Sequence, residues 1–170
     1  MLEIPKDILK HFSNPYMNNQ MFLHAKETYD YLNKITEENF ISDHVCLASK
    51  TLERFYKGFL LEAMEYTSYV PPLDNQHNLP ITETSHNLLK LRHEIQTNFP
   101  EVIPKAAFSE ERNINNKLRR YTEAYKSASY DDFYEYSDLR KILSFTEEEV
   151  KYISEFLEKD NPFEDYQIGD

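Results

Sequence analysis

The chain has 170 residues, of which 19 are basic and 30 acidic, and its net charge of −11 repels a nucleic-acid backbone at long range. Any contact with nucleic acid must therefore be local. The two glycines, Gly58 and Gly169, lie far apart and the only cysteine is Cys46, so the composition excludes glycine-rich phosphate-binding loops, internal disulfides and Cys-x-x-Cys zinc sites.

The length and the 40% share of hydrophobic residues are sufficient for one domain with its own core, and we assign residues 1–170 to a single domain. No apolar stretch approaches the ~20 residues of a membrane span. Residues 1–10 also lack the basic and then apolar order of a signal peptide. We therefore expect a soluble cytoplasmic protein without a membrane partner.

Hydrophobic periodicity predicts two helices in the first part of the chain. The first runs from about Met21 to Ile35 and the second from about Ser42 to Tyr66, where apolar side chains recur every three or four residues. Gly58, inside the second helix, indicates a close approach by another helix. The prolines of residues 70–80 exclude a helix there and predict a long connector.

Two more helices are expected after this connector. Thr82 and Thr84 are candidate caps of a helix that ends before Pro100. The next helix follows Ser109 and keeps its apolar period to about Ala128.

The last third of the chain is less regular. Residues 130–136 are aromatic and acidic without a clean period, which leaves a loop or a short helix. Thr146 and Glu149 have the spacing of a capping box and predict a C-terminal helix over residues 145–159. The acidic tail, residues 160–170, is expected to fray. Together these elements predict an all-α bundle of about five helices.

Histidines are candidate metal ligands and proton carriers, and the chain has six. His86 and His93 are seven residues apart on one predicted helix and hence on one face. Glu83 precedes His86 by three residues, which is half of the paired Glu-x-x-His pattern of di-iron bundles. The second half is absent, so we interpret these histidines as packed or solvated side chains and expect no metal and no cofactor. Cys46 is expected to behave as a small hydrophobic residue.

One segment is basic against the acidic background. A basic helix with interleaved aromatic residues can hold phosphates and stack bases. The alternative is that the cations are solvated on the outer face and paired with acidic neighbours. Tyr121 and Tyr125 are interleaved with five cations within fifteen residues, namely Arg112, Lys117, Arg119, Arg120 and Lys126.

Three short stretches occur in a distinctive order, namely residues 48–60 (ASKTLERFYKGFL), 86–91 (HNLLKL) and 118–122 (LRRYT). They resemble the second helix, the His-Asp-Leu-x-x-Leu start of the third helix and the Arg-Tyr-Pro region of the fourth helix of the HEPN family (higher eukaryotes and prokaryotes nucleotide-binding). These small helical domains occur in toxin–antitoxin, RNA-cleaving and nucleotidyltransferase-associated proteins. The resemblance places a HEPN-like core over about residues 20–130.

The nuclease motif of this family is missing from the chain. Nuclease members share Arg-x(4–6)-His, and no arginine here is followed by a histidine at that spacing. His86 precedes Arg92 by six residues, which is the reverse order. Without that histidine, RNA cleavage loses a general acid or base worth about 10²–10⁴-fold. We therefore expect no nuclease activity and assign no catalytic residue.

The resemblance implies a homodimeric binding domain that takes a nucleotide, RNA or a nucleotidyltransferase-type partner, in a toxin–antitoxin or defence context. In this hypothesis Arg119, Arg120 and Tyr121 lie at the ligand or dimer surface. His86 and Lys90 are expected nearby as further nucleotide-binding or RNA-binding residues.

A second hypothesis is an acidic protein-interaction module, such as an antitoxin, a phage-encoded inhibitor or a nucleic acid mimic. The net charge of −11 and acidic stretches such as residues 147–149 favour it. Charge complementarity with a basic protein partner would then speed association.

Overall fold

The computed structural model describes residues 14–127 and 134–166, and within them the chain is an all-α bundle without strands. This confirms the predicted fold class. None of the described helices combines the length and apolar character that a membrane span requires. The α-helices are α1 (Gln20–Asn33), α2 (Asp43–Tyr66), α3 (Ile81–Thr84), α4 (Leu88–Asn98), α5 (Phe108–Ser127) and α6 (Tyr136–Leu157), with short 3₁₀ helices at Pro15–Met17 and Glu164–Tyr166.

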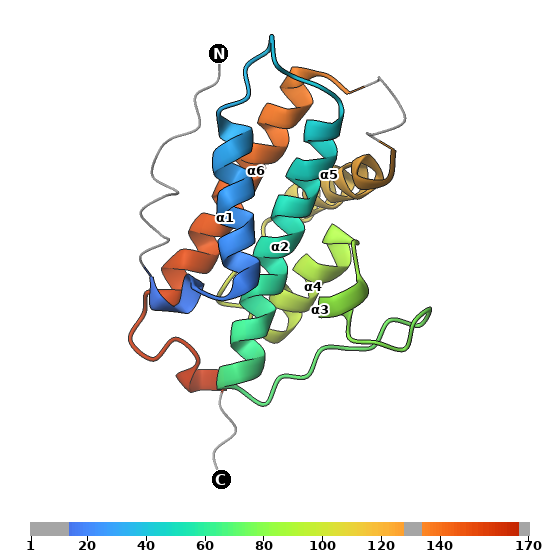
Figure 1. Ribbon diagram of the computed structural model, residues 1–170. Helices are drawn as coiled ribbons and strands as arrows, with labels where there is room; N and C mark the ends of the chain where they lie inside the picture. The colour runs from blue at the N-terminus through green and yellow to red at the C-terminus, as the bar shows by residue number, and fades with distance from the viewer. Residues whose placement is uncertain (1–13, 128–133, 167–170) are drawn as a thin grey trace.

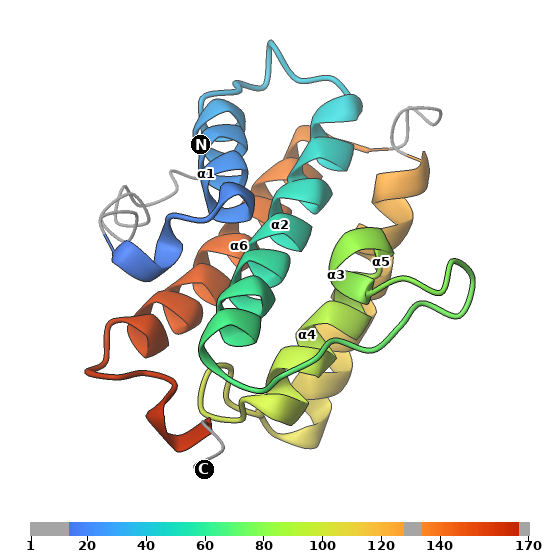
Figure 2. The same ribbon diagram turned by 60° about the horizontal axis from the view of Figure 1, so that its bottom comes forward.

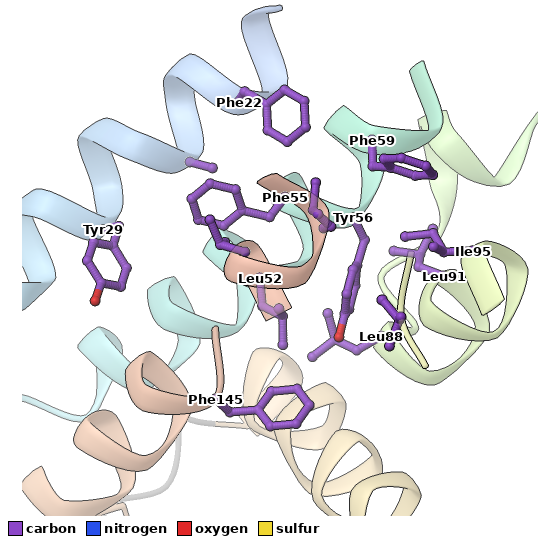
Figure 3. Close-up of a cluster of buried hydrophobic side chains, with 14 of the residues drawn as sticks. Phe22, Tyr29, Leu52, Phe55, Tyr56, Phe59, Leu88, Leu91, Ile95 and Phe145 are labelled. Carbon is purple, nitrogen blue, oxygen red and sulfur yellow. The ribbon is translucent and has the colours of Figure 1, made fainter. Parts of the chain in front are cut away.

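Helix α2 is the centre of the bundle, and α1, α4, α5 and α6 all pack against it (Figure 1). Its long apolar face explains this position, because side chains at helical spacing are buried along its whole length. Figure 3 shows Phe55, Tyr56 and Phe59 of α2 among buried side chains from α1, α4 and α6. The predicted helix over residues 42–66 is therefore confirmed.

Gly58 lies at a close approach between α1 and α2. A Cβ atom added at Gly58 would lie 2.8 Å from the ring of Phe22 on α1, and that ring is fully buried. The Asn19 side chain also donates a hydrogen bond of 2.9 Å to the Gly58 carbonyl. The expected close approach of another helix at Gly58 is confirmed.

The connector before α3 is non-helical, as predicted, and Figure 2 shows it as a long loop that extends from the body of the bundle. The predicted start of the next helix is wrong. Thr82 and Thr84 lie in the short helix α3, and Ser85 is extended after it. Asn87 caps α4 instead, because its side chain accepts a hydrogen bond from the Lys90 amide.

The predicted capping box at Thr146 and Glu149 is also wrong. Helix α6 begins ten residues earlier, at Tyr136, so the C-terminal helix is longer than residues 145–159. Thr146 lies in its interior and donates a hydrogen bond to the Ile142 carbonyl. Glu149 turns into the core. Of the segment 130–136, only residues 134–136 are described, and residues 130–133 lie outside the described residues.

The expected fraying of the acidic tail is wrong for residues 160–166. Phe163 is 2% exposed, and its ring lies 5.5 Å from that of Phe156 and 5.9 Å from that of Phe59. Tyr166 packs on Phe99 at a ring distance of 5.0 Å. Burial of these aromatic rings outweighs the acidic character of the segment. Residues 167–170 lie outside the described residues.

The contact at Gly58 generates the first prediction. Gly58→Ala gains up to ~1 kcal/mol of helix propensity but forces the Phe22 ring to move in a packed core, which costs ~1–3 kcal/mol. We expect net destabilisation of about 1 kcal/mol, measured by urea denaturation. In a Phe22→Leu background the same substitution should cost less, because the ring that it meets is absent. A stabilised Gly58→Ala protein would contradict this account of the contact.

Candidate functional site

A hollow of about 670 Å³ lies between α4 and α5, which pack side by side (Figure 2). The segment that joins the two helices contributes to its wall. We call this hollow the α4–α5 cleft. It is lined by Asn87, Leu89, Lys90, Arg92, His93, Gln96, Lys105, Ala106, Phe108, Glu111 and Asn115.

The helical period of α4 determines which of its side chains reach the cleft. Leu88, Leu91 and Ile95 are fully buried and point to the core. Lys90 and His93 are three residues apart on the exposed side and line the cleft. The Nε2 atom of His93 lies 3.3 Å from the hydroxyl of Thr97 one turn later.

The joining segment is anchored by apolar side chains. Phe99, Val102 and Ile103 are each buried, with exposed fractions of 1–2%. Their burial fixes the path of a segment that has no helix of its own and leaves Lys105 exposed at the cleft.

Two exposed lysines give the cleft its positive charge. Lys90 and Lys105 both line it, and neither forms an ion pair with any described residue. In a chain of net charge −11 this is an uncompensated local positive charge. Ammonium groups of this kind bind phosphate as point charges.

Arg92 reaches the cleft from the core. Its guanidinium is 3% exposed and forms an ion pair through Nε with Oε1 of Glu149, and Nη2 lies 3.5 Å from Oε2 of the same carboxylate. The Tyr56 hydroxyl donates a hydrogen bond of 2.6 Å to Glu149. Burial opposes the charge of Arg92, but attraction to Glu149, Tyr56 and Glu111 outweighs it and raises the arginine pKa. We call Tyr56, Arg92 and Glu149 the buried network.

Glu111 is the acidic residue of the cleft wall, and it is already engaged. Its Oε2 atom lies 3.6 Å from Nη1 of Arg92, and its Oε1 atom accepts a hydrogen bond of 2.8 Å from the Ala106 amide. The Gln96 amide lies 3.5 Å from the same oxygen. Glu111 thus joins the first turn of α5 to α4 and to the joining segment, and it shares the single positive charge of Arg92 with Glu149.

A second hollow, of about 380 Å³, adjoins the cleft on α5. The two hollows share Phe108, Glu111 and Asn115. The second also contains Arg112 and Arg119, so Arg119 and Lys90, both predicted from the sequence, lie in adjoining hollows. We call the second one the α5 hollow; it is lined by Phe108, Glu111, Arg112, Asn115, Asn116 and Arg119.

The other two predicted residues of α5 face elsewhere. Arg120 and Tyr121 line a small cavity of about 90 Å³ together with residues of α6. Tyr121 is only 9% exposed, and its ring lies 6.0 Å from that of Phe145. Burial raises the pKa of Tyr121. The structure therefore separates Arg119 from Arg120 and Tyr121.

His86 lies outside the cleft and outside α4, so it does not share a helix with His93. Its Nδ1 atom lies 2.9 Å from Oε1 of Glu53, whose other oxygen forms an ion pair of 2.9 Å with Lys57. The imidazole stacks on Tyr125 at a ring distance of 4.5 Å. These contacts join α2, the α3–α4 linker and α5.

Other chemistry-bearing residues are placed as follows. Cys46 is half-buried and its thiol donates to the Tyr125 carbonyl at 3.2 Å. Within residues 14–127 and 134–166, no three His, Cys, Asp or Glu side chains are grouped so that they could hold a metal ion.

Sequence reasoning missed Lys105 and Phe108 as residues of the cleft. Both precede the position at which the helix after Ser109 was expected, in a segment interrupted by prolines. The available signal was an aromatic residue three positions after a lysine, Phe108 after Lys105, but only the fold shows that this segment borders α4.

Fold and site together define an all-α helical bundle with a cation-lined cleft in an acidic chain. Comparison with protein-family models, with curated proteins and with solved structures found no match.

The buried network generates a prediction about alkaline pH. Burial and the neighbouring charge of Glu149 raise the pKa of Tyr56 well above its usual value. Tyrosine in the unfolded chain ionises near pH ~10, while folded Tyr56 keeps its proton. The stability from this group is therefore complete below pH ~10 and falls above it by ~1.4 kcal/mol per pH unit.

The variant Tyr56→Phe tests this sign. It should be less stable at neutral pH by ~1–3 kcal/mol, because Glu149 loses a donor. Above pH ~10 its free energy of unfolding should also decline less steeply with pH, because one proton fewer is released on unfolding. Urea denaturation at a series of pH values measures both slopes. Equal slopes in the two proteins would show that Tyr56 ionises normally in the folded state.

Proposed function

We propose that this protein is a non-nuclease binding domain whose α4–α5 cleft takes a phosphate-bearing ligand of the nucleotide or RNA class. The supporting observation is the placement of Lys90 and Lys105, two exposed cations without ion-pair partners among the described residues, at one cleft of a chain with net charge −11. The resemblance to HEPN domains implies the same class of ligand.

The dimensions of the cleft support a small organic ligand. Ligand pockets typically enclose ~300–1,000 Å³, and the cleft has about 670 Å³. Its lining combines apolar side chains such as Leu89 and Phe108 with the amides of Gln96 and Asn115. A nucleotide needs this mixture, because its phosphate seeks cations while its base seeks apolar and hydrogen-bonding surface.

The proposal assigns binding and no catalytic step. A homodimer, and a place in a toxin–antitoxin or defence system beside a nucleotidyltransferase-type partner, belong to the same proposal and rest on the family resemblance alone. Light scattering of the purified chain would measure the oligomeric state directly.

The alternative is an acidic module that binds a basic protein. The structure weakens the support that the acidic stretch 147–149 gives to this alternative. Glu149 is 2% exposed and forms an ion pair with Arg92, so a partner protein cannot reach it. The net charge of −11 still favours this alternative.

The test of the proposal is the double variant Lys90→Glu with Lys105→Glu. Each substitution replaces an attractive contact with a repulsive one, so we expect at least a tenfold loss of affinity for a fluorescent single-stranded RNA hexamer, measured by anisotropy. The slope of log affinity against log salt should also fall by ~0.7 for each phosphate contact removed. Circular dichroism should be unchanged because both side chains are exposed.

The matched control is Lys141→Glu with Lys151→Glu, two exposed lysines of α6 with the same total charge change. This pair should retain affinity within about twofold, since long-range effects of charge are screened beyond ~10 Å at 0.1 M salt. Equal losses of RNA affinity in the two double variants would indicate an effect of net charge alone, and would contradict the assignment of the cleft as the binding site. Absence of binding to RNA and to mononucleotides by the unaltered protein would favour the acidic module.

A further inference from the structure

Phe108 is an exposed aromatic residue between two cationic hollows. It is the first residue of α5 and is 84% exposed, the highest value among the large hydrophobic side chains that the structure describes as exposed. It lines both the α4–α5 cleft and the α5 hollow. A ring left this open to water contributes little to the core, so the fold itself gives no reason for an aromatic residue at this position.

Cations lie on both sides of this ring. Lys90 and Lys105 belong to the cleft, while Arg112 and Arg119 belong to the α5 hollow. Both arginines are exposed, and neither forms an ion pair with the described part of the chain. Arg119 donates a hydrogen bond of 3.1 Å to Asn116, which directs its guanidinium along the helix surface.

The acidic residue shared by the two hollows, Glu111, is mostly buried, with a side chain that is 19% exposed. Glu111 lies 3.6 Å from Arg92 and accepts a hydrogen bond from the Ala106 amide, so its carboxylate is held by contacts within the protein, whereas the four cations are exposed. The sequence of groups across the surface is therefore cation, aromatic ring, cation. In proteins that bind single strands, cations that follow the backbone alternate with rings on which bases stack.

We infer that the ligand is a single-stranded nucleic acid segment of at least two nucleotides, with one base stacked on Phe108 and phosphates in the two hollows. This inference rests on the proposed function and narrows it. A mononucleotide would occupy the cleft and leave Arg112 and Arg119 unused. A duplex would not present a free base face to the ring, because its bases are stacked on one another. Stacking and phosphate contact are common to RNA and DNA.

The experiment compares Phe108→Ala and Phe108→Trp with the unaltered chain. The probes are fluorescent RNA and DNA hexamers, measured by anisotropy, and AMP, measured by calorimetry. Loss of the ring should weaken hexamer binding about 5–150-fold, the equivalent of ~1–3 kcal/mol per stacked base. Tryptophan should preserve the affinity or raise it, and its fluorescence should be quenched on binding. The chain contains no other tryptophan.

Two further variants localise the second phosphate. Arg119→Glu should lower the affinity for the hexamer at least fivefold and change the affinity for AMP less than twofold, because only the longer ligand reaches the α5 hollow. Arg120→Glu is the matched control: Arg120 is the next residue of α5 and is also exposed, but it lines the separate cavity against α6. It should change hexamer binding less than twofold. Comparison of the RNA and DNA hexamers then shows whether the 2′-hydroxyl contributes.

The failures of the two proposals are distinguishable. If AMP and hexamer bind equally and Phe108→Ala changes neither, the strand inference is overturned while the Lys90 and Lys105 variants still test the cleft. If Arg119→Glu and Arg120→Glu weaken the hexamer equally, the two-hollow arrangement is overturned. If neither probe binds the unaltered chain, the proposed function fails and the strand inference fails with it.

Discussion

The carboxylate of Glu149 holds three helices of the bundle in one arrangement. It belongs to α6, accepts a hydrogen bond from Tyr56 of α2 and pairs with Arg92 of α4, and Arg92 in turn lies 3.6 Å from Glu111 of α5. A buried charge without a partner costs several kcal/mol, so these helices must lie in a single register for the network to close. The same contacts position both walls of the α4–α5 cleft, since Arg92 and Glu111 line it. Fold and candidate site thus depend on one set of charges.

The helices that sequence reasoning located well are those whose periodicity is determined by the core. In α2 the apolar residues repeat over the whole helix, and local pattern and tertiary packing agree. The predictions failed where a short local pattern was interpreted without the contacts that its residues make with distant parts of the chain. Thr146 and Glu149 have the spacing of a capping box, but the partners of Glu149 lie 57 and 93 residues away in the chain. Phe163 likewise looked like part of an acidic tail because its aromatic neighbours come from α2 and α6.

The site was less accessible to sequence reasoning for a geometrical reason. Successive residues of a helix point about 100° apart, so the adjacent Arg119 and Arg120 cannot share one ligand surface. The structure places them in different hollows, one beside the cleft and one against α6. A count of cations along the sequence groups Arg119 with Arg120, although the helix directs the two side chains to different hollows. The reverse holds for Lys90 and Lys105, which are fifteen residues apart in the sequence. They come to one cleft because buried Phe99, Val102 and Ile103 fix the path of the segment that joins α4 to α5.

If an acidic protein binds a polyanion through a small basic surface, its net charge discriminates between large and small polyanions. The net charge of −11 opposes the approach of any large anion, and this repulsion acts over the whole surface at low salt. The proposed contacts of Lys90, Lys105 and Arg119 with phosphate would act only within a few ångströms. Added salt screens the repulsion and weakens the contacts at the same time, so the two effects on affinity oppose each other. Under the proposed function, a long duplex would meet the full repulsion and offer the exposed ring nothing to stack on, whereas a short single strand would meet less of the repulsion and reach both hollows. The acidic composition is therefore compatible with the proposed nucleic-acid ligand, and it would restrict that ligand to short single strands.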